Sequence, residues 1–165
     1  MKKVQVLLST YNGEKYLKEQ LDSIIAQKGV DVHILARDDG SKDDTIKILE
    51  GYENIDIIKG SNIGVCKSFF ELINKSGEYD YYSFADQDDV WDCDKLVIAI
   101  NKLEKCNSKP AVYASNTRLV DANLTFLKCE DDNPKTTLGS AFVKNYCTCL
   151  LYTSDAADDL IGVDL

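Results

Sequence analysis

Three aspartates stand within four residues, at Asp86, Asp88 and Asp89, directly after the aromatic run 81–85. Such a run is typical of a buried strand, so the carboxylates are expected at a strand end. Like charges held this close repel each other unless a cation lies between them. Hard divalent cations prefer oxygen ligands, and Mg²⁺ commonly combines one or two carboxylates with substrate phosphates. The spacing therefore indicates a divalent metal site, with an acidic surface turn as the alternative.

Two other polar clusters follow apolar runs in the same way. The cluster 10–12 follows the run 4–8, and the cluster 38–39 follows the run 30–36. Further strand-like runs are expected at 55–58, 81–85 and 111–114. In an open parallel sheet, ligands bind beyond the carboxyl ends of the strands. We therefore expect the three polar clusters to meet at one sheet edge, however far apart they lie in the sequence.

Helical patterns alternate with these runs. Asn12 is expected to cap a first helix that Gly29 ends, and Ser41 with Asp44 has the spacing of a capping box for a second. Asp121 to Asn123 is expected to form a hairpin turn between two later strands. The expected helices are 12–28, 41–49, 66–73 and 96–103. This alternation predicts an α/β fold, with a mostly parallel central sheet flanked by helices on both faces.

Composition limits the possible partners. The chain has 165 residues, and its 28 acids against 19 bases give a net charge of −9. This sign disfavours nucleic acid and anionic membrane surfaces as partners. The sequence contains neither an apolar run as long as a membrane span nor the pattern of a secretion signal. Its cysteines lack metal-site spacing, which favours reduced thiols in a cytoplasmic protein.

The C-terminal residues 149–165 carry a different signal. Cys149 to Asp159 matches, codon by codon, the end of a transposase-type sequencing adapter, and 162–165 matches the fixed sequence beyond that adapter's variable index. We therefore expect 149–165 to be a foreign tail and 1–148 to be the native domain, cut short near Thr148. The tail is expected to be poorly ordered, except that 150–152 can pack by chance. A genuine acidic tail is the alternative.

Four short motifs occur in order along the chain: Ser-Thr-Tyr-Asn-Gly-Glu at 9–14, Asp-Asp-Gly-Ser-Lys-Asp-Asp-Thr at 38–45, Asn-Ile-Gly at 62–64 and Asp-Gln-Asp-Asp-Val-Trp at 86–91. Together they resemble a family 2 glycosyltransferase with the GT-A nucleotide-sugar fold. The last motif resembles the rhamnosyltransferase-like members that build bacterial surface polysaccharides. The resemblance covers roughly the whole of 1–148.

The resemblance implies an activity and a set of binding residues. It implies sugar transfer, with inversion, from a UDP- or dTDP-linked donor to a saccharide or lipid-linked acceptor. Asp86 and Asp88 match the Asp-x-Asp motif that holds Mn²⁺ or Mg²⁺, which neutralises the diphosphate. It also implies a cytoplasmic protein, with peripheral association at the inner face of the membrane as a further expectation. The residues expected to bind the nucleotide are Thr10, Tyr11, Glu14, Asp38, Asp39, Asn62, Gly64 and Asp86.

Other positions carry alternatives. Gln87, Asp89 and Trp91 are expected in the donor or acceptor pocket, although Trp91 also fits a core aromatic. Helix capping is the alternative for 38–41, and an ordinary turn for 62–64. The general base is expected after residue 148, so no catalytic residue is named. The resulting alternative function is a donor-binding fragment without transferase activity.

A basic residue common near position 69 in the family is missing, because Phe69 stands there. A basic clamp on the phosphates is therefore not expected from this position.

Overall fold

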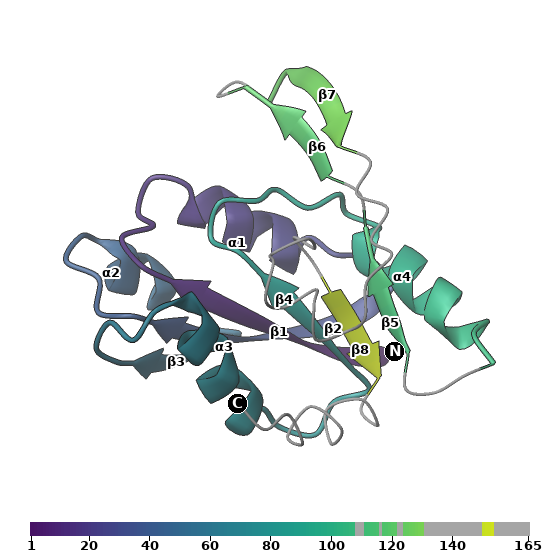
Figure 1. Cartoon of the computed structure of the whole chain (residues 1–165), viewed down its shortest axis with the longest axis horizontal. Helices are drawn as coiled ribbons and strands as arrows, with labels where there is room; N and C mark the ends of the chain where they lie inside the picture. Colours follow the sequence, from purple (N-terminus) through teal and green to yellow (C-terminus); the bar gives the residue numbers. More distant parts are fainter. Residues whose placement is uncertain (108–110, 116, 122–123, 131–149, 154–165) are drawn as a thin grey trace.

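The computed structural model describes residues 1–107, 111–115, 117–121, 124–130 and 150–153 (Figure 1). These residues form one six-stranded sheet, one two-stranded sheet and four helices. The elements are β1 (Lys2–Thr10), α1 (Leu17–Ile25), β2 (Val30–Asp38), α2 (Thr45–Leu49), β3 (Ile55–Lys59), α3 (Val65–Asn74), β4 (Tyr81–Ala85), α4 (Lys95–Glu104), β5 (Val112–Ala114), β6 (Thr117–Val120), β7 (Phe126–Glu130) and β8 (Leu150–Thr153).

The six-stranded sheet has the order β3-β2-β1-β4-β8-β5, and its first four strands are parallel. In this register Thr10 at the end of β1 lies opposite Asp38 at the end of β2. Leu8 of β1 lies opposite Ala85, the last residue of β4. The carboxyl ends of these strands therefore share one edge. The mostly parallel sheet and the meeting of the three polar clusters are both confirmed.

Helices pack on both faces of the sheet because alternate side chains of each strand point to opposite sides. Val4, Val6 and Leu8 belong to a buried cluster with residues of α1, α2 and α4. Leu7 and Leu35 belong to a second cluster, which α3 covers (Figure 1). The residue two positions after Leu35 is Arg37, so its side chain also points toward α3.

The predicted starts of the first two helices were wrong, for a common reason, whereas α3 and α4 each begin within one residue of the predicted start. Asn12 has a positive φ of 49° and binds the loop before α2 instead of capping α1, which begins at Leu17. The hydroxyl of Ser41 binds Asp38, and α2 begins only at Thr45. Both side chains form hydrogen bonds within the loops at this edge of the sheet, so they are not available to cap a helix.

β8 and β5 form the end of the six-stranded sheet opposite β3. β8 pairs antiparallel with both β4 and β5, so residues 150–153 of the expected tail lie within the sheet. Residues 149 and 154–165 lie outside the described residues. β6 and β7 pair antiparallel as a separate hairpin, as predicted from the turn at 121–123. No helix of the described part is long and apolar enough to cross a membrane.

Candidate nucleotide and metal site

The loop after β4 is tied to the loop after β1 by the side-chain amide of Gln87. Its Oε1 accepts the Tyr11 N–H at 2.8 Å, and its Nε2 donates to the Tyr11 carbonyl at 3.1 Å. Gly13, two residues after Tyr11, leaves room for this amide, because a Cβ on Gly13 would lie 2.5 Å from Gln87 Oε1 and would displace it. Gln87, which was predicted to line a pocket, therefore uses both ends of its amide to position a loop.

Tyr11 itself remains open to solvent. Its side chain is at the strand-end edge and is 42% exposed, although its backbone is held by Gln87. A partly exposed aromatic ring on a fixed backbone offers a flat apolar face with little conformational freedom left to lose. This is the geometry that stacking against a nucleobase requires.

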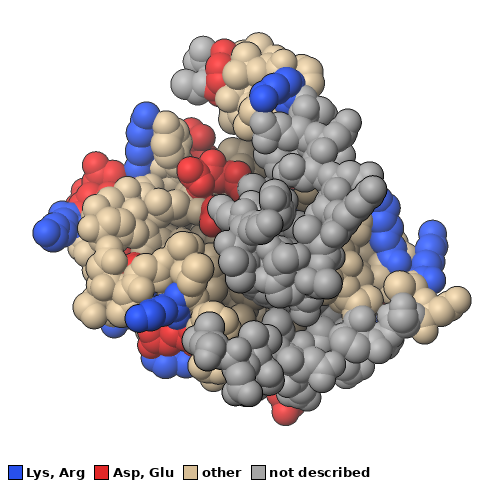
Figure 2. Space-filling view, in the orientation of Figure 1, with Lys and Arg blue, Asp and Glu red and all other residues tan. Residues whose placement is uncertain are grey.

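The acidic loop begins at Asp86, directly after the last residue of β4. Burial, followed by the charges of Asp89 and Asp88, raises the pKa of Asp86 to about 6. Burial also raises the pKa of Asp89, against the opposing effect of Lys95, while Asp88 is exposed. Figure 2 shows acidic side chains gathered near the middle of this face of the molecule. Asp86 is thus held where its negative charge is unfavourable unless a cation compensates it.

This donor set fits a cation that is shared with a ligand. Within the described part of the chain, no three acidic, histidine or cysteine side chains are arranged to hold a metal by themselves. Two carboxylates, one exposed and one partly buried, match the way Mg²⁺ and similar ions are bound jointly by protein and phosphate oxygens. Asp86 and Asp88 therefore fit the ligand roles expected of them.

Asp38 and Thr10 organise the turn after β2. The carboxylate of Asp38 is fully buried, and its Oδ2 accepts the N–H groups of Gly40 at 3.1 Å and Ser41 at 2.9 Å. Its Oδ1 accepts the Ser41 hydroxyl and lies 3.3 Å from the Thr10 hydroxyl. All four of these contacts lie within the protein. Asp38 and Thr10 therefore shape the floor of the site.

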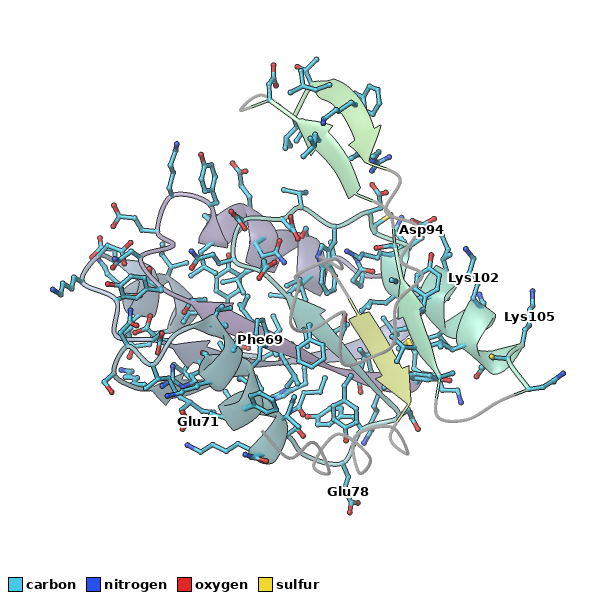
Figure 3. The ribbon with its side chains drawn as sticks, in the orientation of Figure 1. Phe69, Glu71, Glu78, Asp94, Lys102 and Lys105 are labelled. Carbon is cyan, nitrogen blue, oxygen red and sulfur yellow. The ribbon has the colours of Figure 1, made fainter. Side chains whose placement is uncertain are left out.

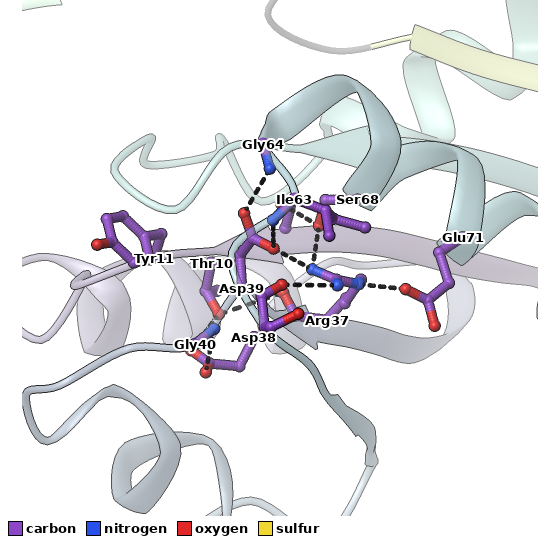
Figure 4. Close-up of polar contacts among 12 residues, drawn as sticks. Thr10, Tyr11, Arg37, Asp38, Asp39, Gly40, Ile63, Gly64, Ser68 and Glu71 are labelled. Carbon is purple, nitrogen blue, oxygen red and sulfur yellow. Dashed lines mark hydrogen bonds and ion pairs between the residues drawn. The ribbon is translucent and has the colours of Figure 1, made fainter.

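Asp39 is also buried, and it faces the loop before α3 (Figure 4). Its Oδ1 accepts from Arg37 Nη1 at 2.5 Å and from the Ile63 N–H at 2.8 Å. Its Oδ2 accepts the Gly64 N–H at 2.9 Å. Burial acts to raise the pKa of Asp39, but the Ile63 N–H, the guanidinium and the Gly64 N–H outweigh it and hold this pKa below its usual range. Asp39 is therefore an ionised acceptor at neutral pH.

Arg37 is the residue of this site that the sequence reasoning missed. Its side chain is only 2% exposed, and its guanidinium reaches Asp39, Glu71, Ser68 and the Ser61 carbonyl. The available signal was its position: a charged residue two places after Leu35, on a strand face that is otherwise buried. Its partners on α3 lie more than 30 residues away, so spacing alone could not identify them.

Glu14 links the first loop to the start of α2. Its carboxylate accepts the Asp44 N–H at 2.9 Å, and its own N–H donates to Asp43 at 3.1 Å. The Gly13 N–H donates to the Thr45 hydroxyl at 2.8 Å. Glu14, predicted to bind the nucleotide, thus holds two loops together at the edge of the site.

The remaining predicted residues divide between the core and the surface. Trp91 is 5% exposed and belongs to the core cluster, with Lys95 Nζ 4.4 Å from its ring centroid. This placement favours the core alternative. Asn62 is exposed, and Gly64 precedes α3 with a φ of 85°. Phe69 of α3 (Figure 3) is half-buried and packs edge-on against Phe84, with the ring centroids 5.2 Å apart, so position 69 makes an apolar contact at the border of the core.

A parallel sheet whose strand ends carry an open aromatic ring, a buried ionised aspartate and an acidic loop has the arrangement in which open α/β sheets bind ligands. The chain belongs to glycosyl transferase family 2, whose family model matches residues 5–159. The resemblance drawn from the four motifs is thereby confirmed.

Named relatives agree with this assignment. The chain is 42% identical over 118 residues to the dTDP-rhamnosyl transferase RfbG of Shigella flexneri, covering 66% of this chain and 40% of the relative. It is 30% identical to the uncharacterized glycosyltransferase RP339 of Rickettsia prowazekii, covering 76% of this chain and 40% of the relative. The chain thus spans about 40% of the length of these two relatives.

Solved structures support the fold. The S. aureus TarS 1-349 structure in complex with UDP-GlcNAc superposes with a TM-score of 0.65 at 26% identity, covering 73% of this chain and 36% of that one. The mannosyltransferase PcManGT from Pyrobaculum calidifontis, solved with GDP-Man and Mn²⁺, superposes with a TM-score of 0.69, covering 98% and 47% of the two chains. At 14% identity this second likeness concerns the fold alone. The predicted GT-A fold is confirmed.

Proposed function

We propose that this chain binds a nucleotide-diphospho-sugar, as the donor-binding part of a glycosyltransferase that acts in bacterial surface polysaccharide synthesis. The observation that carries the proposal is the meeting of Tyr11, Asp39 and the pair Asp86 and Asp88 at one edge of the sheet. The 42% identity to a dTDP-rhamnosyl transferase supports a UDP- or dTDP-linked donor and a saccharide or lipid-linked acceptor.

Base recognition follows from Tyr11 and Asp39. The exposed ring of Tyr11 offers a surface for stacking, and the ionised Asp39 can only accept hydrogen bonds. Uracil and thymine carry an N–H at ring position 3, whereas cytosine carries a lone pair there. A carboxylate therefore favours the first two bases, because a lone pair facing it is repelled.

Metal binding involves Asp86 and Asp88. These side chains would hold Mn²⁺ or Mg²⁺ together with the donor diphosphate, where the cation neutralises charge on the leaving group. The partly buried position of Asp86 shields this contact from water, which strengthens electrostatic interactions. Asp88, being exposed, can reach a ligand that arrives from solvent.

The general base is not assigned to any residue that the structure describes. Asp38 and Asp39 are engaged within loops, and Asp86 and Asp88 are proposed for the metal. The base, expected in native sequence beyond residue 148 where this chain carries the expected foreign tail, stays a prediction. The cytoplasmic location and the contact with the inner face of the membrane also stay predictions.

Calorimetry with UDP, dTDP, CDP and GDP, each with Mn²⁺ and with chelator, tests the proposal. UDP or dTDP should bind most tightly, and Mn²⁺ should increase the affinity at least about tenfold, the effect of about 1.4 kcal/mol. Asp88→Ala should abolish the Mn²⁺ effect. Asp94→Ala is the matched control, because Asp94 is an exposed carboxylate outside the acidic loop.

Three outcomes would contradict the proposal in different ways. Equal affinity with Mn²⁺ and with chelator would remove Asp86 and Asp88 from the metal site. Preference for CDP would remove Asp39 from base recognition, because cytosine has no N–H at ring position 3. Preference for GDP would contradict the UDP- or dTDP-linked donor but not the role of Asp39, because guanine also carries ring and amino N–H groups that a carboxylate accepts.

A transferase and a chain that only binds donor are separated by turnover. We propose that residues 1–148 are the native donor-binding part and that 149–165 are foreign. The proposal predicts that the 165-residue chain releases nucleoside diphosphate from donor at most weakly, because loss of a general base alone costs about 10²–10⁴-fold in rate. A coupled release assay with and without saccharide acceptor measures this. Full acceptor-dependent turnover would place the base among the residues present.

A further inference from the structure

The buried guanidinium of Arg37 lies at the centre of the loop network around Asp39 (Figure 4). Its Nε donates to Glu71 at 2.6 Å and its Nη1 to Asp39 at 2.5 Å. Nη1 also donates to Ser68 at 3.2 Å, and Nη2 to the Ser61 carbonyl at 3.2 Å. These four hydrogen bonds within the protein use four of the five N–H donors of the guanidinium, so Arg37 is committed to its protein partners.

The surrounding chain is shaped to accept this side chain. A Cβ on Gly60 would lie 2.4 Å from Arg37 Nη2, so the chain after β3 needs glycine where it passes the guanidinium. Ser68, which is fully buried, binds both Arg37 and Ser9 of β1. Arg37 therefore joins β2, the loop 60–64 and α3 into one unit.

The consequence for Asp39 is a restricted number of free acceptor positions. A carboxylate offers about four lone-pair positions. The guanidinium and the N–H groups of Ile63 and Gly64 occupy three of them. Both oxygens accept a backbone N–H, so a proton on either one competes with the bond that fixes the loop.

We propose that Arg37 is a positioning residue for nucleotide recognition, holding Asp39 and the loop 61–64 so that Asp39 presents one remaining acceptor position to the base. This inference rests on the proposed function, because it takes Asp39 as the group that meets the base. A Lys at this position would keep the charge but could not bind Asp39 and Glu71 together, because an ammonium lacks the planar fork of guanidinium.

Electrostatics supplies the measurable signature. Among the described residues, the charged groups linked to Asp39 by ion pairs are Arg37, Glu71 of α3 and, through Glu71, the exposed Lys75. Asp38 is the adjacent residue in the chain. An opposite charge at this distance typically lowers the pKa of a carboxyl by about 1–3 units. Without the guanidinium, burial would act on Asp39 with less opposition. Protonation of Asp39 would then begin at a higher pH and interfere with base binding.

The test compares UDP affinity at pH 7.5 and pH 5.0, in chelator, for the wild type, Arg37→Met, Arg37→Lys and Glu71→Gln. Chelator removes metal binding, and any remaining effect of other titrating groups is common to all four proteins. Arg37→Met should lose about three- to tenfold more affinity between the two pH values than the wild type does. Arg37→Lys should lose less than Arg37→Met. Glu71→Gln, which leaves the contact between Arg37 and Asp39 in place, should parallel the wild type.

The outcomes separate this inference from the proposed function. If the wild type binds neither UDP nor dTDP under any condition, the proposed function fails and the inference fails with it. If the wild type binds and Arg37→Met shows a parallel pH profile, the inference alone is overturned, and Arg37 is only structural. Should Arg37→Met not fold, Arg37→Lys decides: an extra loss of about two- to threefold supports the inference, and a parallel profile overturns it.

Discussion

Replacement of Asp86 by asparagine should stabilise the metal-free protein. The pKa of Asp86 is about 6 in the folded chain, against an ordinary value of 3.8. A folded-state pKa above the unfolded one means that the native state binds the proton more tightly, so stability falls as pH rises from about 4 to about 6. Above that window the ionised carboxylate destabilises the folded state. Asparagine is nearly the same size and carries no charge.

The magnitude follows from the shift. A difference of about two pKa units, at about 1.4 kcal/mol each, corresponds to about 3 kcal/mol. This is an upper value, because Asp86 keeps some contact with water. The gain from Asp86→Asn should be absent near pH 4, grow through the window and reach about 2–3 kcal/mol at pH 7.5. The melting temperature should rise by several degrees in a chain of this size.

Urea unfolding in chelator at pH 4, 5, 6 and 7.5 measures the effect. Asp94→Asn is the matched control, because the exposed Asp94 should change the unfolding free energy by less than about 0.5 kcal/mol. Adding Mn²⁺ with UDP should stabilise the wild type more than it stabilises Asp86→Asn. A variant that is equally stable or less stable than the wild type at pH 7.5 would refute the reasoning. A gain that does not depend on pH would show that repacking, and not ionisation, is the cause.

Three further predictions concern the loops, the core and the tail. Gly13→Ala should displace Gln87 and lower the free energy of urea unfolding by about 1–2 kcal/mol. In the double variant with Gln87→Ala the two losses should be less than additive, and strict additivity would contradict the contact. Trp91→Phe should leave UDP affinity within about twofold because the ring belongs to the core. The free energy of unfolding should change by less than about 1 kcal/mol, because Trp91 Nε1 has no hydrogen-bond partner within the described part. A tenfold loss of affinity would place the ring in the pocket. Ending the chain at Thr148 should shift the melting temperature by only a few degrees if residues 149–165 are foreign. A larger drop would show that β8, which pairs with β4 and β5, is part of the native sheet.

The fold could be predicted from the sequence because the spacing of apolar residues and the positions of turn residues indicate the same elements. Apolar runs such as 30–36 alternate with helical stripes, and polar clusters mark the strand ends that the parallel register brings together. The helix starts failed where a loop elsewhere in the chain competed for the same side chain, as with Asn12 and Ser41. Propensity describes local alternatives, and only the assembled sheet decides among them.

The residues with the chemistry of the candidate site could be predicted from the sequence, but the side chains that hold them in place could not. Asp86 and Asp39 stand out by residue type and by motif, since carboxylates crowded at strand ends repel each other unless other groups compensate their charge. The side chains that hold them do not stand out. The contacts of Gln87 with Tyr11 and of Arg37 with Glu71 could not be predicted, because the partners of each lie tens of residues away in the chain. Supporting contacts of this kind depend on how elements are brought together in space.

The amide of Gln87 has a consequence for how ligands would act on each other. In the sequence, Gln87 lies between the two proposed metal ligands, Asp86 and Asp88. Its side-chain amide forms two hydrogen bonds with the backbone of Tyr11. A shift of either loop is therefore transmitted to the other. Cation and base would then be thermodynamically linked, each raising the affinity for the other by the same factor. Removal of this amide should reduce that mutual factor more than it reduces the affinity for either ligand alone.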